Sequence, residues 1–163
     1  QNIFNMDKII ELARKEIGTK EVPANSNTVK YNTWIYGKEV ANTKLSKYPW
    51  CAAFVSWVFD MAGYNLGRID VLKGFDGCNF AVNNVAKWGK IVTIPRASDV
   101  VFFDWKGDGW FDHVGIFVKD LGQGFFESIE GNTGLLNLSN GGEVMLCKRK
   151  YKVAIFIRPN VIK

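Results

Sequence analysis

Histidine occurs once in the 163 residues of this chain, at His113, and cysteine occurs three times, at Cys51, Cys78 and Cys147. Three cysteines are too few, and odd in number, for a disulfide framework, so at least one thiol is free in a monomer. Their spacing and that of the single histidine do not match a zinc site, and we expect no metal and no cofactor. Any imidazole chemistry must come from His113.

Long apolar runs are also missing. No stretch approaches the ~18 apolar residues of a membrane span, and residues 1–7 lack the basic and apolar regions of a signal peptide. Repeats, low-complexity tracts and linkers rich in proline or glycine are absent. The sequence therefore predicts one domain over residues 5–159, large enough to bury a core without staples. We expect a monomer without membrane insertion, and no signal peptide within this chain.

The charge that is present is basic, with a net charge of +5 and a pI of about 9.1. A basic surface favours anionic partners such as nucleic acid or cell-wall polymers, although a solvated basic face gives the same balance. The densest basic run, residues 148–150, is short and comes with no RNA-binding or helix-turn-helix signature. We therefore do not expect nucleic acid as a partner.

Apolar spacing changes period halfway along the chain. Residues 5–17 have the spacing of an amphipathic helix, and residues 31–34 suggest a short helix or packed loop. An almost wholly apolar helix is expected to begin near Pro49 and to end before Gly63. A third helix is expected over residues 79–88. Short strands are then expected over 100–105, 114–119, 125–130, 143–151 and 153–158, separated by turns rich in glycine. Helices followed by consecutive strands favour an α+β domain with N-terminal helices packed on an antiparallel sheet.

Cys51 and His113 are the residue types that nucleophilic amide chemistry requires. Cys51 falls in the first turn of the apolar helix, where unpaired N–H groups and the helix dipole stabilise a thiolate. A free cysteine in an apolar helix is also commonly a small buried hydrophobe, and a lone histidine at a strand end is commonly structural. What separates these readings is whether a third polar group lies beside His113.

The pairing expected in a hairpin that contains His113 indicates which polar residue lies beside it. If the turn centres on residues 121–122, His113 pairs with Glu130; if it centres on 122–123, His113 pairs with Asn132. Both registers place the same side chains on the same face, whereas a three-residue loop would reverse the faces. Either Glu130 or Asn132 is then suited to hold the imidazole tautomer, as the third member of a Cys–His–Asn or Ser–His–Asp site does.

Three motifs in this order resemble the CHAP family, the cysteine- and histidine-dependent amidohydrolases/peptidases. They are Tyr48-Pro49-Trp50-Cys51-Ala52-Ala53-Phe54-Val55, Asp99-Val100-Val101-Phe102-Phe103 with Asp112-His113-Val114-Gly115-Ile116, and Glu130-Gly131-Asn132-Thr133. The resemblance implies a papain-like fold, a Cys51 nucleophile, a His113 base, an orienting Glu130, and Asn132 as a fourth polar group of the site.

The same resemblance implies cleavage of peptidoglycan, at the N-acetylmuramoyl-L-alanine amide or within the peptides, by an endolysin-like bacteriolytic enzyme. Such an enzyme is secreted or phage-delivered to the bacterial wall, with peptidoglycan as partner and anionic wall polymers as a further partner. Alternatives are an amidase of a soluble molecule such as a glutathionyl-polyamine amide, a non-catalytic wall-binding or virion structural module, and a basic nucleic-acid-binding domain.

Calcium-binding members of the family carry an Asp-rich loop before the cysteine, but residues 41–47 contain no carboxylate, so calcium is not expected. Residues 104–109 begin like an EF-hand, yet Lys106 occupies a ligand position and Gly115 replaces the bidentate glutamate. This segment therefore predicts a turn.

We expect the backbone N–H of Cys51 to form part of an oxyanion hole. The glutamine donor of papain-like enzymes is replaced by Leu45, and Tyr48 is the candidate substitute. The residues expected to line a substrate groove are Trp50, Tyr48, Trp105, Trp110 and Tyr31.

Overall fold

A computed structural model describes residues 3–40 and 48–162 of the chain, with side chains from residue 8 onward. In that part the helices are α1 (Ile3–Glu16), α2 (Lys30–Tyr36), α3 (Cys51–Met61) and α4 (Cys78–Asn83), with 3-10 turns at Val85–Lys87 and Tyr151–Val153. The strands are β1 (Gly89–Val92), β2 (Val100–Phe103), β3 (His113–Gly122), β4 (Phe125–Thr133), β5 (Glu143–Lys150) and β6 (Ala154–Pro159). No described helix is long and apolar enough to cross a membrane.

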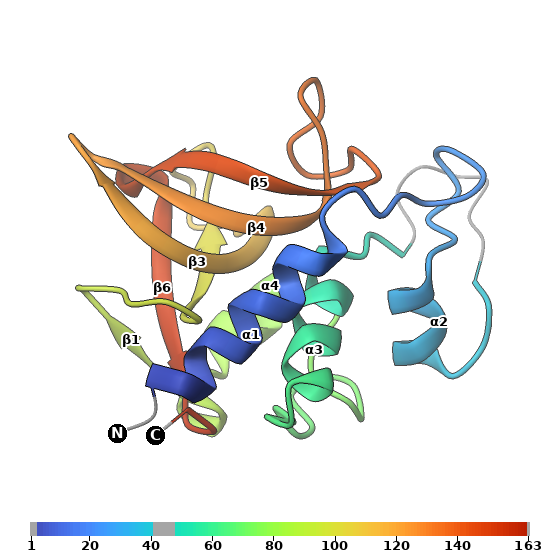
Figure 1. The fold of residues 1–163 in the computed structure, drawn as a ribbon, viewed down its shortest axis with the longest axis horizontal. Coiled ribbons are helices and arrows are strands. Elements are labelled where there is room, and N and C mark those ends of the chain that lie inside the picture. Colours follow the sequence, from blue (N-terminus) through green and yellow to red (C-terminus); the bar gives the residue numbers. More distant parts are fainter. Residues whose placement is uncertain (1–2, 41–47, 163) are drawn as a thin grey trace.

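The strands form one curved antiparallel sheet in the order β1-β6-β2-β3-β4-β5, with α1 and α3 packed across one side of it (Figure 1). This arrangement confirms the predicted α+β, papain-like class. Strand β1 was not expected, and it is a four-residue edge strand in which two residues are exposed. The expected third helix ends at Asn83 and continues only as a 3-10 turn.

Strand alternation divides the apolar side chains into two clusters. The cluster between sheet and helices includes Val100, Phe102, Val114, Ile116 and Ile129. The cluster on the opposite face consists of Val101, Phe103, Phe117, Phe126 and Phe156. Because successive side chains point to opposite faces, odd-numbered residues of β2 and β3 lie on the second face, and His113 is one of them.

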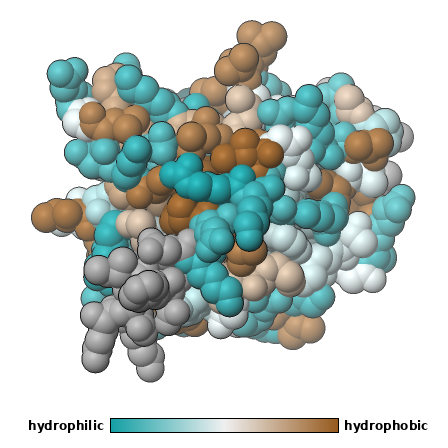
Figure 2. Space-filling model, in the orientation of Figure 1, coloured by the Kyte–Doolittle hydropathy of each residue, from teal (hydrophilic) through white to brown (hydrophobic). Residues whose placement is uncertain are grey.

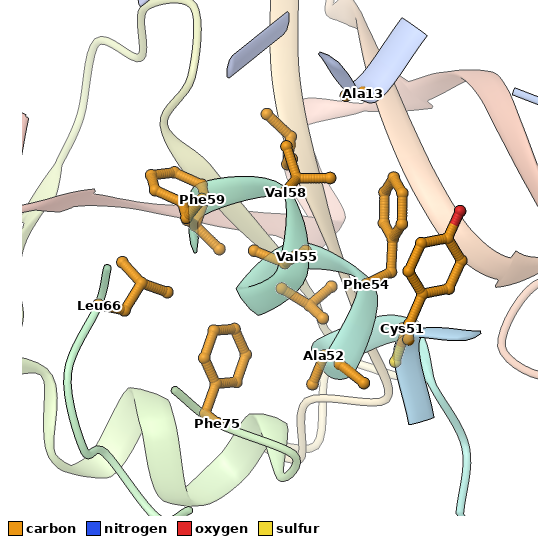
Figure 3. Close-up of a cluster of buried hydrophobic side chains, with 14 of the residues drawn as sticks. Ala13, Cys51, Ala52, Phe54, Val55, Val58, Phe59, Leu66 and Phe75 are labelled. Atoms are coloured by element: carbon orange, nitrogen blue, oxygen red, sulfur yellow. The ribbon is translucent and has the colours of Figure 1, made fainter. Parts of the chain in front are cut away.

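Helix α3 is the centre of the first cluster (Figure 3). Eight of its eleven residues are buried, which explains why its sequence is apolar nearly all round. Its side chains meet α1 at Ala13 and the following loop at Leu66 and Phe75. Gly131 of β4 brings the sheet close to the helix, because a Cβ there would lie 2.7 Å from Cβ of Phe54. The packing therefore fixes where the first turn of α3 meets the sheet.

Candidate active site

Cys51 is the first residue of α3 and is 5% exposed. The helix begins two residues after Pro49, so the backbone N–H groups of its first turn surround the thiol region. Figure 3 shows Cys51 at the end of the apolar cluster. Position and dipole both favour the thiolate form of this side chain.

His113 and Glu130 form the buried polar pair beside this helix start. Nε2–H of His113 donates to Oε1 of Glu130 over 2.9 Å, and neither side chain has exposed surface. Among the described residues, Nδ1 of His113 has no hydrogen-bonding nitrogen or oxygen partner. Since Nε2 is committed to Glu130, Nδ1 is the ring nitrogen left to interact with Cys51.

The β3–β4 register explains how the pair forms. The hairpin turns at Gln123 and Gly124, both with positive φ, and Gly122 pairs with Phe125. Two irregularities then shift the register, so that Ile116 pairs with Ile129. The two shifts together preserve the predicted face of each side chain.

Glu130 reaches His113 diagonally, across Gly115. A Cβ on Gly115 would lie 2.6 Å from Cγ of Glu130, closer than real Cβ contacts come. Glycine at this position therefore leaves the space through which the carboxylate reaches the imidazole. Of the two partners left open by the sequence, the structure gives Glu130.

The pKa shifts describe a thiolate facing an imidazolium. A hydrogen bond from the Cys78 thiol lowers the pKa of Cys51 against the effect of burial, and His113 lowers it further. Burial disfavours a charged His113, but its interactions with Cys51 and Glu130 raise its pKa to about 9. Burial also disfavours a charged Glu130, yet His113 and Arg149 lower its pKa to about 2. The lowered pKa of Cys51 and the raised pKa of His113 both favour the thiolate–imidazolium form of this pair.

Asn132 is fully buried near the end of β4 and hydrogen bonds with the following loop. Its Nδ2 donates to Oδ1 of Asn140 over 3.0 Å, and its Oδ1 accepts from the Gly142 N–H over 3.2 Å. These contacts tie the 134–142 loop to the end of β4. The role of Asn132 as a fourth polar group of the site stays a prediction, because its described hydrogen bonds are with this loop and not with His113.

Two of the aromatic residues expected to line a groove are in the core. Trp50 and Tyr31 have no exposed surface and stack at 5.5 Å between ring centroids. Indole Nε1–H of Trp50 donates to the buried carboxylate of Glu21, and the Tyr31 hydroxyl donates to Glu16. The assignment of both residues to a substrate groove is corrected: Trp50 directly precedes α3, and Tyr31 packs against Phe54 of that helix.

The other three expected groove residues keep some exposed surface. Trp105 is half-buried, stacks on Phe103 at 4.6 Å and donates from Nε1 to Oγ of Ser139. Trp110 is 62% exposed. Tyr48 is half-buried with a φ of 62° and packs against Tyr36. Leu45 and the rest of residues 41–47 lie outside the described residues.

A cleft of about 480 Å³ opens between the 134–142 loop and the segment around Asn25. Leu135 and Leu136 line it and are 87% and 102% exposed. Figure 2 shows hydrophobic residues on the projection at the top of the molecule, where Figure 1 places this loop. Asn132 therefore braces an apolar loop at the end of the strand that carries Glu130.

The sequence did not identify three residues that contact the site. Cys78 begins α4, and its thiol lowers the pKa of Cys51. Ser128 and Arg149 both donate to the Glu130 carboxylate. Strand alternation was a usable signal for Ser128, two residues before Glu130 on the same face. Cys78 and Arg149 come from elements whose pairing the sequence did not predict.

Within the described residues, no three histidine, cysteine or acidic side chains are grouped as metal ligands. The Asp104 carboxylate instead accepts the N–H groups of Gly107, Asp108 and Gly109. These bonds make residues 104–109 a self-capped turn.

Comparison with protein families agrees with this geometry. No curated protein sequence matches the chain significantly. The family model of the CHAP domain matches residues 43–132, from just before Cys51 through His113 and Glu130, and spans more than half of the chain. The protein therefore belongs to the CHAP family, whose members are amidase and peptidase hydrolases.

Proposed function

We propose that this protein hydrolyses an amide bond of bacterial peptidoglycan, either the N-acetylmuramoyl-L-alanine bond or a bond within the peptides. The observation that supports this best is the buried set of Cys51, His113 and Glu130, in which the pKa of Cys51 is lowered and that of His113 is raised. The net charge of +5 favours association with anionic wall polymers. We place the action at the bacterial wall, reached by secretion or by phage delivery, as in endolysins.

The proposed reaction passes through a thioester. The Cys51 thiolate attacks the amide carbonyl, and the backbone N–H of Cys51 stabilises the oxyanion. His113 gives its proton to the leaving nitrogen as the C–N bond breaks, which leaves the acyl group on Sγ. His113 then removes a proton from water, which attacks the thioester and releases the carboxylic acid and the thiolate. Glu130 holds the ring in orientation and stabilises the imidazolium.

Substrate choice tests the proposal. Purified peptidoglycan and a soluble glutathionyl-polyamine amide are offered to the same enzyme, with wall turbidity and free amine as readouts. We expect the walls to clear and the soluble amide to remain. Turnover of the soluble amide without wall clearing would make the protein a small-molecule amidase. Wall binding without release of fragments would make it a non-catalytic module.

The pH profile is expected to have two limbs. As the pH is raised through the acidic range, activity should increase because Cys51 loses its proton. Activity should then decrease near pH 9, because His113 loses the proton that the leaving group needs. The measurement is kcat/KM for wall hydrolysis between pH 4 and 10, with iodoacetamide alkylation of Cys51 as a direct reading of the acid limb. A rate that keeps increasing above pH 9, as for an ordinary thiol, would contradict the ion pair.

Gly115→Ala is expected to lower activity about 100-fold, because a displacement of about 1 Å in a catalytic geometry has that scale of effect. The new methyl group would overlap Cγ of Glu130 and push the carboxylate away from His113. Initial rates of wall hydrolysis, together with the thermal unfolding midpoint, measure the change.

Gly89→Ala is the matched control for crowding. A Cβ there would lie 2.7 Å from the carbonyl oxygen of Arg158, in the edge pair β1–β6 away from Cys51. We expect this variant to lose stability while its folded fraction keeps the wild-type rate. Equal losses of activity in the two variants would show that Gly115 has only a packing role.

A further inference from the structure

Arg149 is a charged residue at the site with no part in the reaction as written above. It lies on β5, opposite Phe126 of β4. Strand alternation places it on the same face as Ser128 and Glu130. Its side chain is 11% exposed and points to the buried carboxylate.

The contact between Arg149 and Glu130 is bidentate. Nε donates to Oε2 over 2.9 Å and Nη2 donates to Oε1 over 2.6 Å. The hydroxyl of Ser128 donates to Oε2 over 2.5 Å, and His113 occupies Oε1. Two parallel N–H···O bonds fix the plane of a carboxylate as well as its position, which a single donor does not do. The oxygen that accepts from His113 is therefore set by Arg149.

The guanidinium is itself held in place. Its carbon lies 5.1 Å from the centroid of the Trp105 ring and 5.7 Å from that of Phe103, and Nη2 also donates to Oγ1 of Thr133 over 3.3 Å. Trp105 is fixed in turn by its stacking on Phe103 and its bond to Ser139. Arg149 is thus a rigid support for Glu130 and not a mobile surface cation.

Charge balance gives the support a second consequence. The buried site holds a Cys51 thiolate, a His113 imidazolium and a Glu130 carboxylate, which together carry one net negative charge. An uncompensated charge of this kind is costly in a buried site, and Arg149 neutralises it. Without that cation the acidic groups of the site hold protons more tightly.

From this geometry we infer that Arg149 is a positioning residue of the reaction, orienting Glu130 on His113 and keeping the four-group site neutral. The inference rests on the proposed function, since it assigns Arg149 to the same thiol chemistry. It predicts two separable effects, one from the bidentate geometry and one from the positive charge.

Arg149→Met removes both effects and Arg149→Lys removes the bidentate geometry alone. We expect Arg149→Met to lower kcat about 10- to 100-fold with little change in KM, since Glu130 loses its orientation. Its acid limb should move up by about one pH unit, the scale of a lost opposite charge. Arg149→Lys should return the acid limb to the wild-type position while recovering only part of kcat.

Arg158→Met is the matched control. Arg158 makes the same kind of bidentate contact with buried Asp99, with bonds of 3.0 Å and 2.8 Å at the opposite end of β2 from His113. This variant should lose stability without moving the pH profile. If Arg149→Met behaves like Arg158→Met, with lower stability and an unmoved acid limb, Arg149 is only structural and the inference is overturned.

The test remains decisive in two other situations. If Arg149→Met does not fold, Arg149→Lys carries the test, and a wild-type kcat in that variant would overturn the inference. If the wild-type protein does not cleave walls, the proposed function fails, but the pH dependence of Cys51 alkylation still reads the Arg149 effect without a substrate. An acid limb of alkylation that is the same in wild type and Arg149→Met would then overturn it.

Discussion

Replacing Cys51 with alanine is expected to lower the rate of wall hydrolysis by about 10⁴- to 10⁶-fold, the scale seen when a covalent nucleophile is removed. The thiolate of Cys51 forms the bond to substrate. Among the described residues, Cys51 is the cysteine with a lowered pKa, and it lies at the start of α3. The methyl group fits the same space, so stability should change little. Turbidity of purified walls, followed over hours, measures the residual rate.

Cys78→Ala separates the two neighbouring thiols. The hydrogen bond with Cys51 and burial raise the pKa of Cys78, so its thiol stays protonated and is a poor nucleophile. We expect this variant to remain active, with its acid limb moved upward because a hydrogen bond to the Cys51 thiolate is lost. Loss of activity in Cys78→Ala together with retention in Cys51→Ala would assign the nucleophile to Cys78.

His113→Ala is expected to produce a loss of comparable size, about 10⁴-fold or more, because the acid and base steps both depend on this ring. The chain has no second histidine to replace it. Wall hydrolysis at pH 7 gives the rate, and Cys51 alkylation across pH 5–9 gives the thiolate fraction. Without the imidazolium, the alkylation limb should move to higher pH.

Glu130→Gln is the companion variant, because it keeps the shape of the side chain and removes its charge. It should lower activity less than His113→Ala does, and it should move the alkaline limb below pH 9, since the imidazolium loses the carboxylate that raises its pKa. An unchanged rate in His113→Ala would show that another group moves the protons and would contradict the reaction proposed here.

The fold could be predicted where the side-chain pattern of a single segment determines its secondary structure. Helix α3 is buried nearly all round, so an apolar run of that length had one reading. Strand β1 is different because it is short, half exposed and held by pairing with β6, which lies far along the chain. Its sequence therefore carries little signal of its own.

The site was predictable as far as local geometry reaches. His113 and Glu130 are predicted to share one face of a single hairpin. The observed hairpin keeps that face because its two register shifts together leave the alternation of side chains unchanged. The choice between Glu130 and Asn132 needed those shifts and the space above Gly115. Arg149 looked like part of a surface basic run, because its contact depends on the β4–β5 register across a long loop.

The burial of Trp50 shows a second limit of sequence reasoning. A tryptophan beside the candidate nucleophile suggests a groove wall, yet its indole N–H is satisfied by the buried carboxylate of Glu21. A buried tryptophan needs such a partner, and Glu21 lies 29 residues away in the chain. Only the packed structure brings the two together.

The most direct test of the account is mass spectrometry of the fragments released from purified peptidoglycan by the wild-type protein and by Cys51→Ala. The proposed thiol mechanism predicts new amide-cleavage ends in the wild-type digest, either free L-alanine termini or new peptide termini, and none with Cys51→Ala. Equal fragments from both proteins, or wild-type fragments cut within the sugar chain, would contradict it.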